Sequence, residues 1–198
     1  VLFRSYAELH CISNFSFLRG ASHADELVRR AHTLGYAALA ITDECSFAGI
    51  VRAHAAARAC GLKLIIGTQI SLSDGPKVVL LATNREGYGD LCELITLGRR
   101  RENKGTYRLA RSDLDGGMPG CLALLIPSPG DRHFPHPHDL DLEKSHACWL
   151  AERFSGRAWI AVELHRGPKD RERLMELRAL SRSCALPLVA AGDVDRKS

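Results

Sequence analysis

The chain has 198 residues, of which 45% are hydrophobic and 25% charged, and its formal net charge is +4. These values are those of an ordinary globular protein with one sizeable core. The longest apolar runs are only as long as a strand, which excludes a membrane span, and no secretory signal pattern precedes the first expected strand.

The two ends of the chain differ from the rest. The segments VLFRS and DRKS can be encoded by one sequencing adapter and its reverse complement, so we expect residues 1–5 and 195–198 to be adapter-derived and residues 6–194 to form the domain. Each tail carries a net charge of +1, which leaves +2 for the remainder. That charge is too small to indicate nucleic-acid binding by itself.

Seven cysteines are scattered singly along the chain, and no pair has C-x-x-C spacing. This distribution argues against a zinc finger or a thioredoxin-type motif. An odd, dispersed set is typical of reduced, mostly buried thiols in a cytoplasmic protein.

Expected strands and helices alternate along the chain. The strands are expected, in chain order, over residues 6–12, 37–42, 62–72, 77–83, 121–126, 158–164 and 186–191, and the third is expected to be interrupted at Gly67. Helices are expected between them, in chain order over residues 22–34 and 47–60, after residue 84, around residues 142–150 and over residues 174–184. Ser22, Ser46 and Asn84 are the expected N-caps, and Gly35 and Gly61 the expected ends of the first two helices. The Pro-, His- and Asp-rich stretch 127–141 predicts a loop.

This alternation predicts an α/β fold with a mostly parallel sheet and right-handed crossovers. About seven strands in fewer than 200 residues favour a small, distorted β/α barrel, with an open doubly wound sheet as the alternative. The sequence contains no glycine-rich nucleotide-binding motif.

Polar residues recur where the expected strands end, which in a parallel barrel is where functional groups gather. In chain order they are His10, Thr42-Asp43-Glu44, Gly67-Thr68-Gln69, Pro127-Ser128, Glu163 with His165, and Gly192-Asp193. The alternative explanation for any one of them is that strand ends reach solvent in every fold.

Several segments carry a specific resemblance: ELHCISNFSFLRGAS, ALAITDECSFAGIVRAHAAA, LIIGTQI, VELHRGPKD and AAGDV. Together they resemble the N-terminal PHP domain (polymerase and histidinol phosphatase) of bacterial C-family DNA polymerases, and more narrowly the error-prone, DNA polymerase III alpha-like subfamily. The resemblance covers residues 6–194 and implies a distorted seven-stranded β/α barrel.

The resemblance also implies a site for up to three divalent metals, which activate water and neutralise phosphate charge. Only His10 and Asp193 match the family's ligand types, and Glu44 could still coordinate a metal; Asp43, Gln69, Glu163 and His165 are expected at the rim. The chain departs from the family's ligand pattern at five positions: Ile12, Arg19, Glu44, Gln69 and Pro127. A sixth position, 195, falls in the suspected adapter. We therefore expect a degenerate site in which Zn²⁺ or Mn²⁺ binding is doubtful.

The implied parent is a cytoplasmic, error-prone DNA polymerase, which transfers nucleotides with Mg²⁺ held in a palm domain. DNA and dNTPs would bind through the missing domains, and this domain would be a structural partner of the palm and thumb, with no catalytic residue of its own and no membrane contact. The alternatives are a free-standing PHP phosphoesterase of the histidinol phosphatase type and a proofreading 3′–5′ exonuclease within the polymerase.

Two further clusters have weaker signals. The residues His133, His136, His138, Asp139 and Asp141 could bind metal, although a solvated loop is the simpler interpretation. Arg99, Arg100, Arg101 and Lys104 could contact a DNA backbone, although cations also favour a helix C-terminus.

Overall fold

The computed structural model describes residues 6–127, 137–165 and 167–195, with side chains of the helix at 137 described from residue 141. In chain order it contains β1 (Ala7–Glu8), α1 (Ala24–Thr33), β2 (Ala38–Ile41), α2 (Ile50–Cys60), β3 (Lys63–Ser71), β4 (Lys77–Ala82), α3 (Arg85–Arg100), the 3₁₀ helix η1 (Arg111–Leu114), β5 (Cys121–Ile126), α4 (Pro137–Arg153), β6 (Ala158–Val162), α5 (Asp170–Cys184) and β7 (Leu188–Ala190). None of the described helices combines the length and apolar character needed to span a bilayer.

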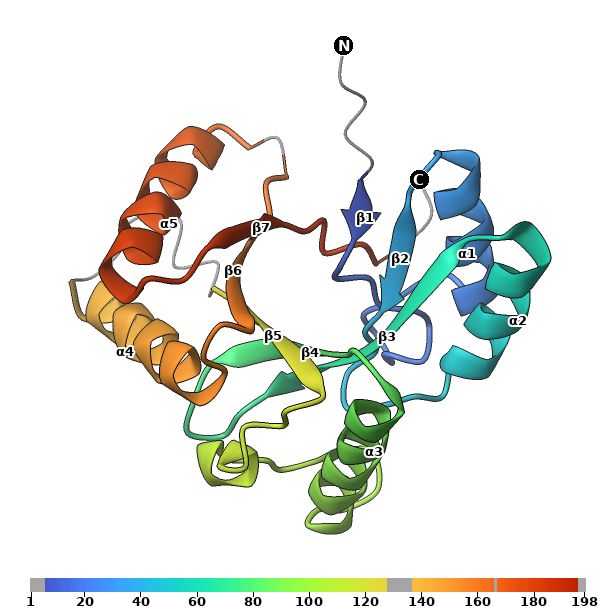
Figure 1. Cartoon of the computed structure of the whole chain (residues 1–198), viewed down its shortest axis with the longest axis horizontal. Coiled ribbons are helices and arrows are strands. Elements are labelled where there is room, and N and C mark those ends of the chain that lie inside the picture. The colour runs from blue at the N-terminus through green and yellow to red at the C-terminus, as the bar shows by residue number, and fades with distance from the viewer. Residues whose placement is uncertain (1–5, 128–136, 166, 196–198) are drawn as a thin grey trace.

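The strands form one seven-stranded sheet in the order β1 to β7. Figure 1 shows the sheet curled into a ring with the helices outside it: α1 and α2 lie beside β2 and β3, and α4 and α5 beside β6 and β7. Most neighbours are parallel, but β4 is antiparallel to both β3 and β5. The predicted α/β barrel is confirmed, and its sheet is mixed.

The two edge strands approach each other and close the ring. Cys11 and Val194 form a parallel bridge, in which Ile12 N donates to Val194 O (2.8 Å) and Val194 N donates to His10 O (3.0 Å). An open doubly wound sheet would keep these edges apart. The closure therefore excludes that alternative and brings the end of β1 next to the end of β7.

Gly67 marks the point where β3 changes partners. Residues 63–66 pair in parallel with β2, and residues 67–71 pair antiparallel with β4. A Cβ on Gly67 would lie 2.6 Å from Leu80 O, so only glycine permits this close approach. The strand predicted over 62–72 runs through Gly67 without interruption, so Thr68 and Gln69 lie inside a strand and not beyond its end.

Two predicted helix starts are wrong. The first helix has His23 as its N-cap, and the Glu26 carboxylate accepts a hydrogen bond from His23 N (3.1 Å). The second helix begins at Ile50 after Gly49, because Ser46 instead uses its hydroxyl to accept from Ala48 N in a local turn. By contrast, Asn84 caps α3 as predicted, through its side chain and Gly87 N (2.8 Å).

Other boundaries differ at their ends. The strands β1, β6 and β7 are shorter than predicted, because β pairing stops where the chain turns into the site. The stretch 127–141 is not wholly a loop, since α4 begins at Pro137; proline suits the first turn of a helix, where its missing N–H has no partner to lose. Ser128, His133, His136 and the proposed adapter residues 1–5 and 196–198 lie outside the described residues.

The core follows the alternation of side chains along each strand. One set faces the helices: Leu39 and Ile41 join the α1–α2 cluster, and Val78, Leu80, Ala123 and Leu125 join the cluster with α3, α4 and α5. The alternate set forms a third cluster inside the ring, with Ala40, Val79, Leu81, Leu124, Ile126, Ala161 and Ala191. Because both faces are apolar, the barrel is filled and its chemistry is confined to one end.

The buried thiols predict an alkaline loss of stability. Burial raises the pKa of Cys45 and of Cys121 to about 11, from a usual value of 9.0. The unfolded chain therefore releases these protons first, and we expect the free energy of unfolding to fall as pH rises from 9 towards 11. Urea midpoints measured across this range will test it. The double variant Cys45→Ser/Cys121→Ser should show a shallower decline, and an unchanged slope would contradict the prediction.

Candidate functional site

The site is centred on His10, which follows β1 and is 1% exposed. Its Nδ1 lies 2.6 Å from Glu163 Oε1, just beyond β6, and 3.6 Å from Asp193 Oδ1, just beyond β7. Its Nε2 lies 2.9 Å from Gln69 Oε1 on β3. The barrel thus brings together four predicted residues from positions far apart in the chain.

The hydrogen bonds around Gln69 define its orientation. Gln69 Nε2 donates to Glu44 Oε2 (2.9 Å), and its Oε1 accepts from Arg19 Nη2 (3.3 Å). Because Oε1 is an acceptor, His10 Nε2 must donate to it. Since Nδ1 faces the Glu163 carboxylate, the imidazolium form of His10, with a proton on each ring nitrogen, satisfies both contacts.

The charges around His10 favour the same protonated form. Burial alone lowers the pKa of His10, but the hydrogen bond and charge of Glu163, with the charge of Asp193 and the hydrogen bond to Gln69, outweigh burial and raise the pKa above its usual value of 6.5. The raised pKa of His10 therefore favours a positive charge beside the two carboxylates.

Glu44 is held by other partners. Its carboxylate pairs with Arg19 and accepts from Tyr107 Oη (2.6 Å) and Ser71 Oγ (3.3 Å), besides Gln69. Burial and the hydrogen bond to Glu44 raise the pKa of Tyr107, so it stays a donor. Among the described residues, Glu44 is therefore linked to His10, Glu163 and Asp193 (the His10 group) only through Gln69.

Asp43 is a buried anchor for the loop that follows His10. It is 1% exposed, and its carboxylate accepts from Ser13 N (2.7 Å), Ser13 Oγ (2.7 Å) and Ser16 Oγ (2.8 Å). These bonds hold the segment that ends at Arg19. Asp43 was expected at the rim of the metal site. It is instead buried, and its hydrogen bonds position this loop.

Glu8 is a residue that our sequence reasoning missed. It is 1% exposed on β1, and its Oε1 accepts from both His10 N and Gly192 N (2.9 Å each), while Oε2 accepts from Tyr6 Oη (2.8 Å). Glu8 thus fastens the end of β1 to the end of β7 and positions His10 beside Asp193. The signal was an acidic residue within the otherwise apolar run YAELHCI.

This role predicts different effects for two substitutions of Glu8. We expect Glu8→Ala to lower the free energy of unfolding by about 2–3 kcal/mol, because it leaves two buried N–H groups without an acceptor. Glu8→Gln keeps one oxygen for those groups and should cost only about 1 kcal/mol. Chemical denaturation of the two variants tests this. Equal losses of stability in the two variants would contradict this role of Glu8, because the expected difference depends on the oxygen that Glu8→Gln retains.

Within the described residues, one group of three side chains could hold a metal ion: His10, Glu163 and Asp193, whose ligand atoms all lie within 4.8 Å of one another. One imidazole and two carboxylates fit a single divalent ion with open positions. The surroundings do not fit a cluster of several metal ions. Ile12 is buried and has no donor atom, Gln69 is neutral, and Arg19 adds a positive charge. His165 is exposed beyond Glu163, and Pro127 is half-buried without a donor side chain.

The predicted basic cluster differs in how its members are held. Arg99 donates to the carbonyl oxygens of Glu44, Cys45 and Thr106 and lies over the Tyr107 ring. Arg101 makes a two-pronged ion pair with Asp113. Arg100 and Lys104 are exposed. Two of the four cations are thus occupied within the protein.

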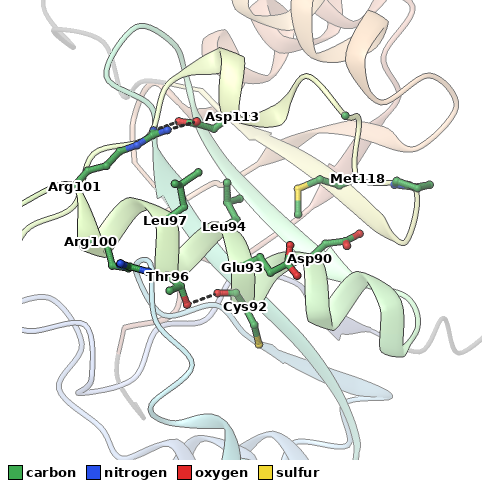
Figure 2. A pocket seen from close by; sticks show the side chains of 12 residues that line it. Asp90, Cys92, Glu93, Leu94, Thr96, Leu97, Arg100, Arg101, Asp113 and Met118 are labelled. Carbon is green, nitrogen blue, oxygen red and sulfur yellow. Dashed lines mark hydrogen bonds and ion pairs between the residues drawn. The ribbon is translucent and has the colours of Figure 1, made fainter.

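A separate hollow of about 830 Å³ is lined by residues of α3 and of the segment 113–119. Figure 2 shows Leu94, Leu97 and Met118 lining it, with the Arg101–Asp113 pair at one end. No residue of the His10 group lines it. The hollow is therefore distinct from the candidate metal centre.

In the predicted His-rich cluster, Asp141 is exposed, while the side chains of His138 and Asp139 lie outside the described part.

Comparison with known proteins agrees with this geometry. The model of the PHP domain family matches residues 8–131. The chain belongs to the PHP domain family. As a PHP domain it is 57% identical over 194 residues to an error-prone DNA polymerase of Dechloromonas aromatica and 56% identical over 190 residues to one of Pseudomonas paraeruginosa. These matches cover 96% of this chain but only 18% and 17% of the two polymerases.

Solved structures share the fold of this PHP domain at low sequence identity. An amidohydrolase from Chromobacterium violaceum, with bound sulfate and no metal, has a TM-score of 0.64 at 17% identity, covering 98% of this chain and 89% of the other. A candidate metal-dependent phosphoesterase from Bifidobacterium adolescentis has a TM-score of 0.65 at 14% identity, covering 97% and 88%. At these identities the likeness concerns the fold alone.

Proposed function

We propose that this chain is the N-terminal PHP domain of an error-prone DNA polymerase and that it is structural in that protein. The support is the identity of 57% and 56% to error-prone polymerases across nearly the whole chain. The parent would be a cytoplasmic nucleotidyltransferase acting on DNA and dNTPs. Its Mg²⁺ would be held in a palm domain outside this segment, and the PHP domain would pack on the palm and thumb.

One observation supports a domain without catalysis of its own: Gln69 and Arg19 stand beside His10 and Glu44, where the family pattern has acidic side chains. The site is thereby satisfied internally, as an imidazolium between Glu163 and Gln69 and a guanidinium paired with Glu44. A divalent ion would have to displace the His10 protons and approach Arg19, and both steps oppose binding.

His10, Glu163 and Asp193 would hold the one ion that the donor set fits, and Zn²⁺ or Mn²⁺ would suit these ligands. Such an ion would polarise a bound water or a phosphoryl oxygen. This chain's own contribution would be to orient the ligands, through the hydrogen bonds of Glu8 and through the loop that Asp43 anchors. A phosphoesterase or an exonuclease would depend on this single ion.

The test compares hydrolysis with polymerisation. The purified chain, incubated with Mn²⁺ or Zn²⁺, should release no phosphate from p-nitrophenyl phosphate and no nucleotide from single-stranded DNA beyond the level of a His10→Ala variant. The full-length parent should extend a primer, and its extension rate should not change in His10→Ala. Metal-dependent hydrolysis lost in His10→Ala would instead identify a phosphoesterase or exonuclease.

The gene offers an independent test of the parent. The reading frame beyond Val194 in the source genome should continue into a palm domain with paired carboxylates. A stop codon within tens of residues would contradict the polymerase assignment. The same reading would show whether residue 195 is a natural aspartate or, as we propose for residues 195–198, adapter-derived.

A further inference from the structure

Two cysteines far apart in the sequence meet between the outer helices. Cys148 on α4 and Cys184 at the end of α5 have their sulfur atoms 2.9 Å apart. A disulfide bond is about 2.05 Å long, so the sulfurs need to approach by less than about 1 Å. Among the described residues, no other two cysteine sulfurs lie within hydrogen-bonding distance of each other.

The helices that carry this pair are held in place by other contacts. Arg173 on α5 pairs with Glu143 on α4 (3.0 Å) and with Glu176 of its own helix (3.2 Å). Cys184 is 8% exposed, and its sulfur also lies 3.6 Å from Lys144 O. Cys148 is only partly buried. The packing of α4 against α5 therefore holds the two thiols next to each other in the folded protein.

We propose that Cys148 and Cys184 are a redox modification site, which hydrogen peroxide or a related peroxide converts into a disulfide linking α4 to α5. The Cys148 thiolate attacks one peroxide oxygen, the O–O bond breaks, and the departing hydroxide takes a proton to become water. The Cys184 sulfur then attacks the resulting sulfenic acid, forms the S–S bond and releases a second water. Two thiols are oxidised, and one peroxide is reduced to two waters.

The position of the link determines what it would stabilise. The bond would close a loop of about 36 residues that contains β6, and α5 leads directly into β7. Glu163 and Asp193 lie just beyond these two strands, at the end of the barrel. The link would thus fasten the part of the barrel that carries both carboxylates, from its outer side. The hydrogen bond to Cys184 raises the pKa of Cys148, so the reaction should accelerate as pH rises.

The experiment treats the purified chain, with all seven cysteines, with hydrogen peroxide and measures its mass. The expected result is a loss of about 2 Da, a cross-linked peptide joining residues 148 and 184 after proteolysis, and full reversal by dithiothreitol. The oxidised protein should melt about 5–10 °C higher than the reduced one, because the link constrains the unfolded chain.

Matched variants identify the pair. Cys148→Ser and Cys184→Ala should each abolish the mass loss, while Cys92→Ser, which removes another partly buried helical thiol, should retain it. If Cys184→Ala fails to fold, Cys148→Ser still decides the question. A gain of about 32 Da at Cys148, which indicates sulfinic acid, or unchanged alkylation of both thiols after peroxide would overturn the proposal. Neither outcome affects the proposed polymerase parent.

Discussion

Replacing Asp43 by alanine is expected to lower the free energy of unfolding by about 3–5 kcal/mol, the largest single-residue effect we predict. The carboxylate is 1% exposed and accepts three hydrogen bonds from Ser13 and Ser16. Alanine would leave these donors buried without partners and would leave a cavity in their place. Urea denaturation, followed by circular dichroism, measures the loss.

Two further variants make the Asp43 prediction specific. Asp43→Asn keeps the shape but turns an amide N–H₂ towards a hydroxyl or N–H donor, so we expect an intermediate loss of about 1–3 kcal/mol. The control is Asp25→Ala, which removes a carboxylate that pairs with Arg29 across one turn of α1 and should cost less than about 0.5 kcal/mol. If Asp43→Ala matched Asp25→Ala, Asp43 would not anchor the loop.

Restoring two acidic residues is expected to create a stronger metal site. The double variant Arg19→Asp/Gln69→Glu removes the guanidinium beside Glu44 and adds a carboxylate 2.9 Å from His10 Nε2 in place of an amide. We expect the affinity for Zn²⁺ or Mn²⁺ to rise on the order of 10–100-fold, because a carboxylate that accepts from His10 Nε2 orients the ring and makes Nδ1 a better ligand, and because an opposing charge disappears. Isothermal titration calorimetry and metal analysis of the purified protein measure the affinity and stoichiometry.

The metal experiment needs a control for the loss of a paired guanidinium. Arg29→Gln also removes a guanidinium that pairs with a carboxylate, but on the exposed side of α1, and should leave metal affinity unchanged. Adding His10→Ala to the double variant should abolish the gain. Strong binding of several ions by the unmodified chain would contradict our view that Arg19 and Gln69 weaken the site.

The direction of β4 could have been predicted from spacing. Only five residues, 72–76, separate β3 from β4, whereas a parallel crossover needs a dozen or more. The strand pattern was detected from apolar runs, which carry no information on direction. The misplaced N-caps have a similar cause: Ser22 and Ser46 each satisfy a local rule for capping, but tertiary packing decides where the first helical turn begins.

The sequence indicated the residues of the site but not which of them contact one another. His10, Glu163, Asp193 and Gln69 were all expected near strand ends, because side chains beyond parallel strands converge at one end of a barrel. Their pairing was not predictable, because a one-dimensional pattern does not say which strand end faces which. Glu163 was expected at the rim and lies 2.6 Å from His10, whereas Glu44 is held by Arg19 and Tyr107.

The sequence by itself determined the class of fold, the family and the set of polar residues at one end of the barrel. Hydrophobic periodicity and motif identity are local properties, and both are readable along the chain. Only the tertiary structure decided that the sheet closes through Cys11 and Val194, that Glu8 fastens His10 to the end of β7, and that Cys148 faces Cys184. Apart from the bond between Glu8 and His10, these contacts join residues 36 to 184 positions apart, and their geometry depends on how whole strands and helices pack.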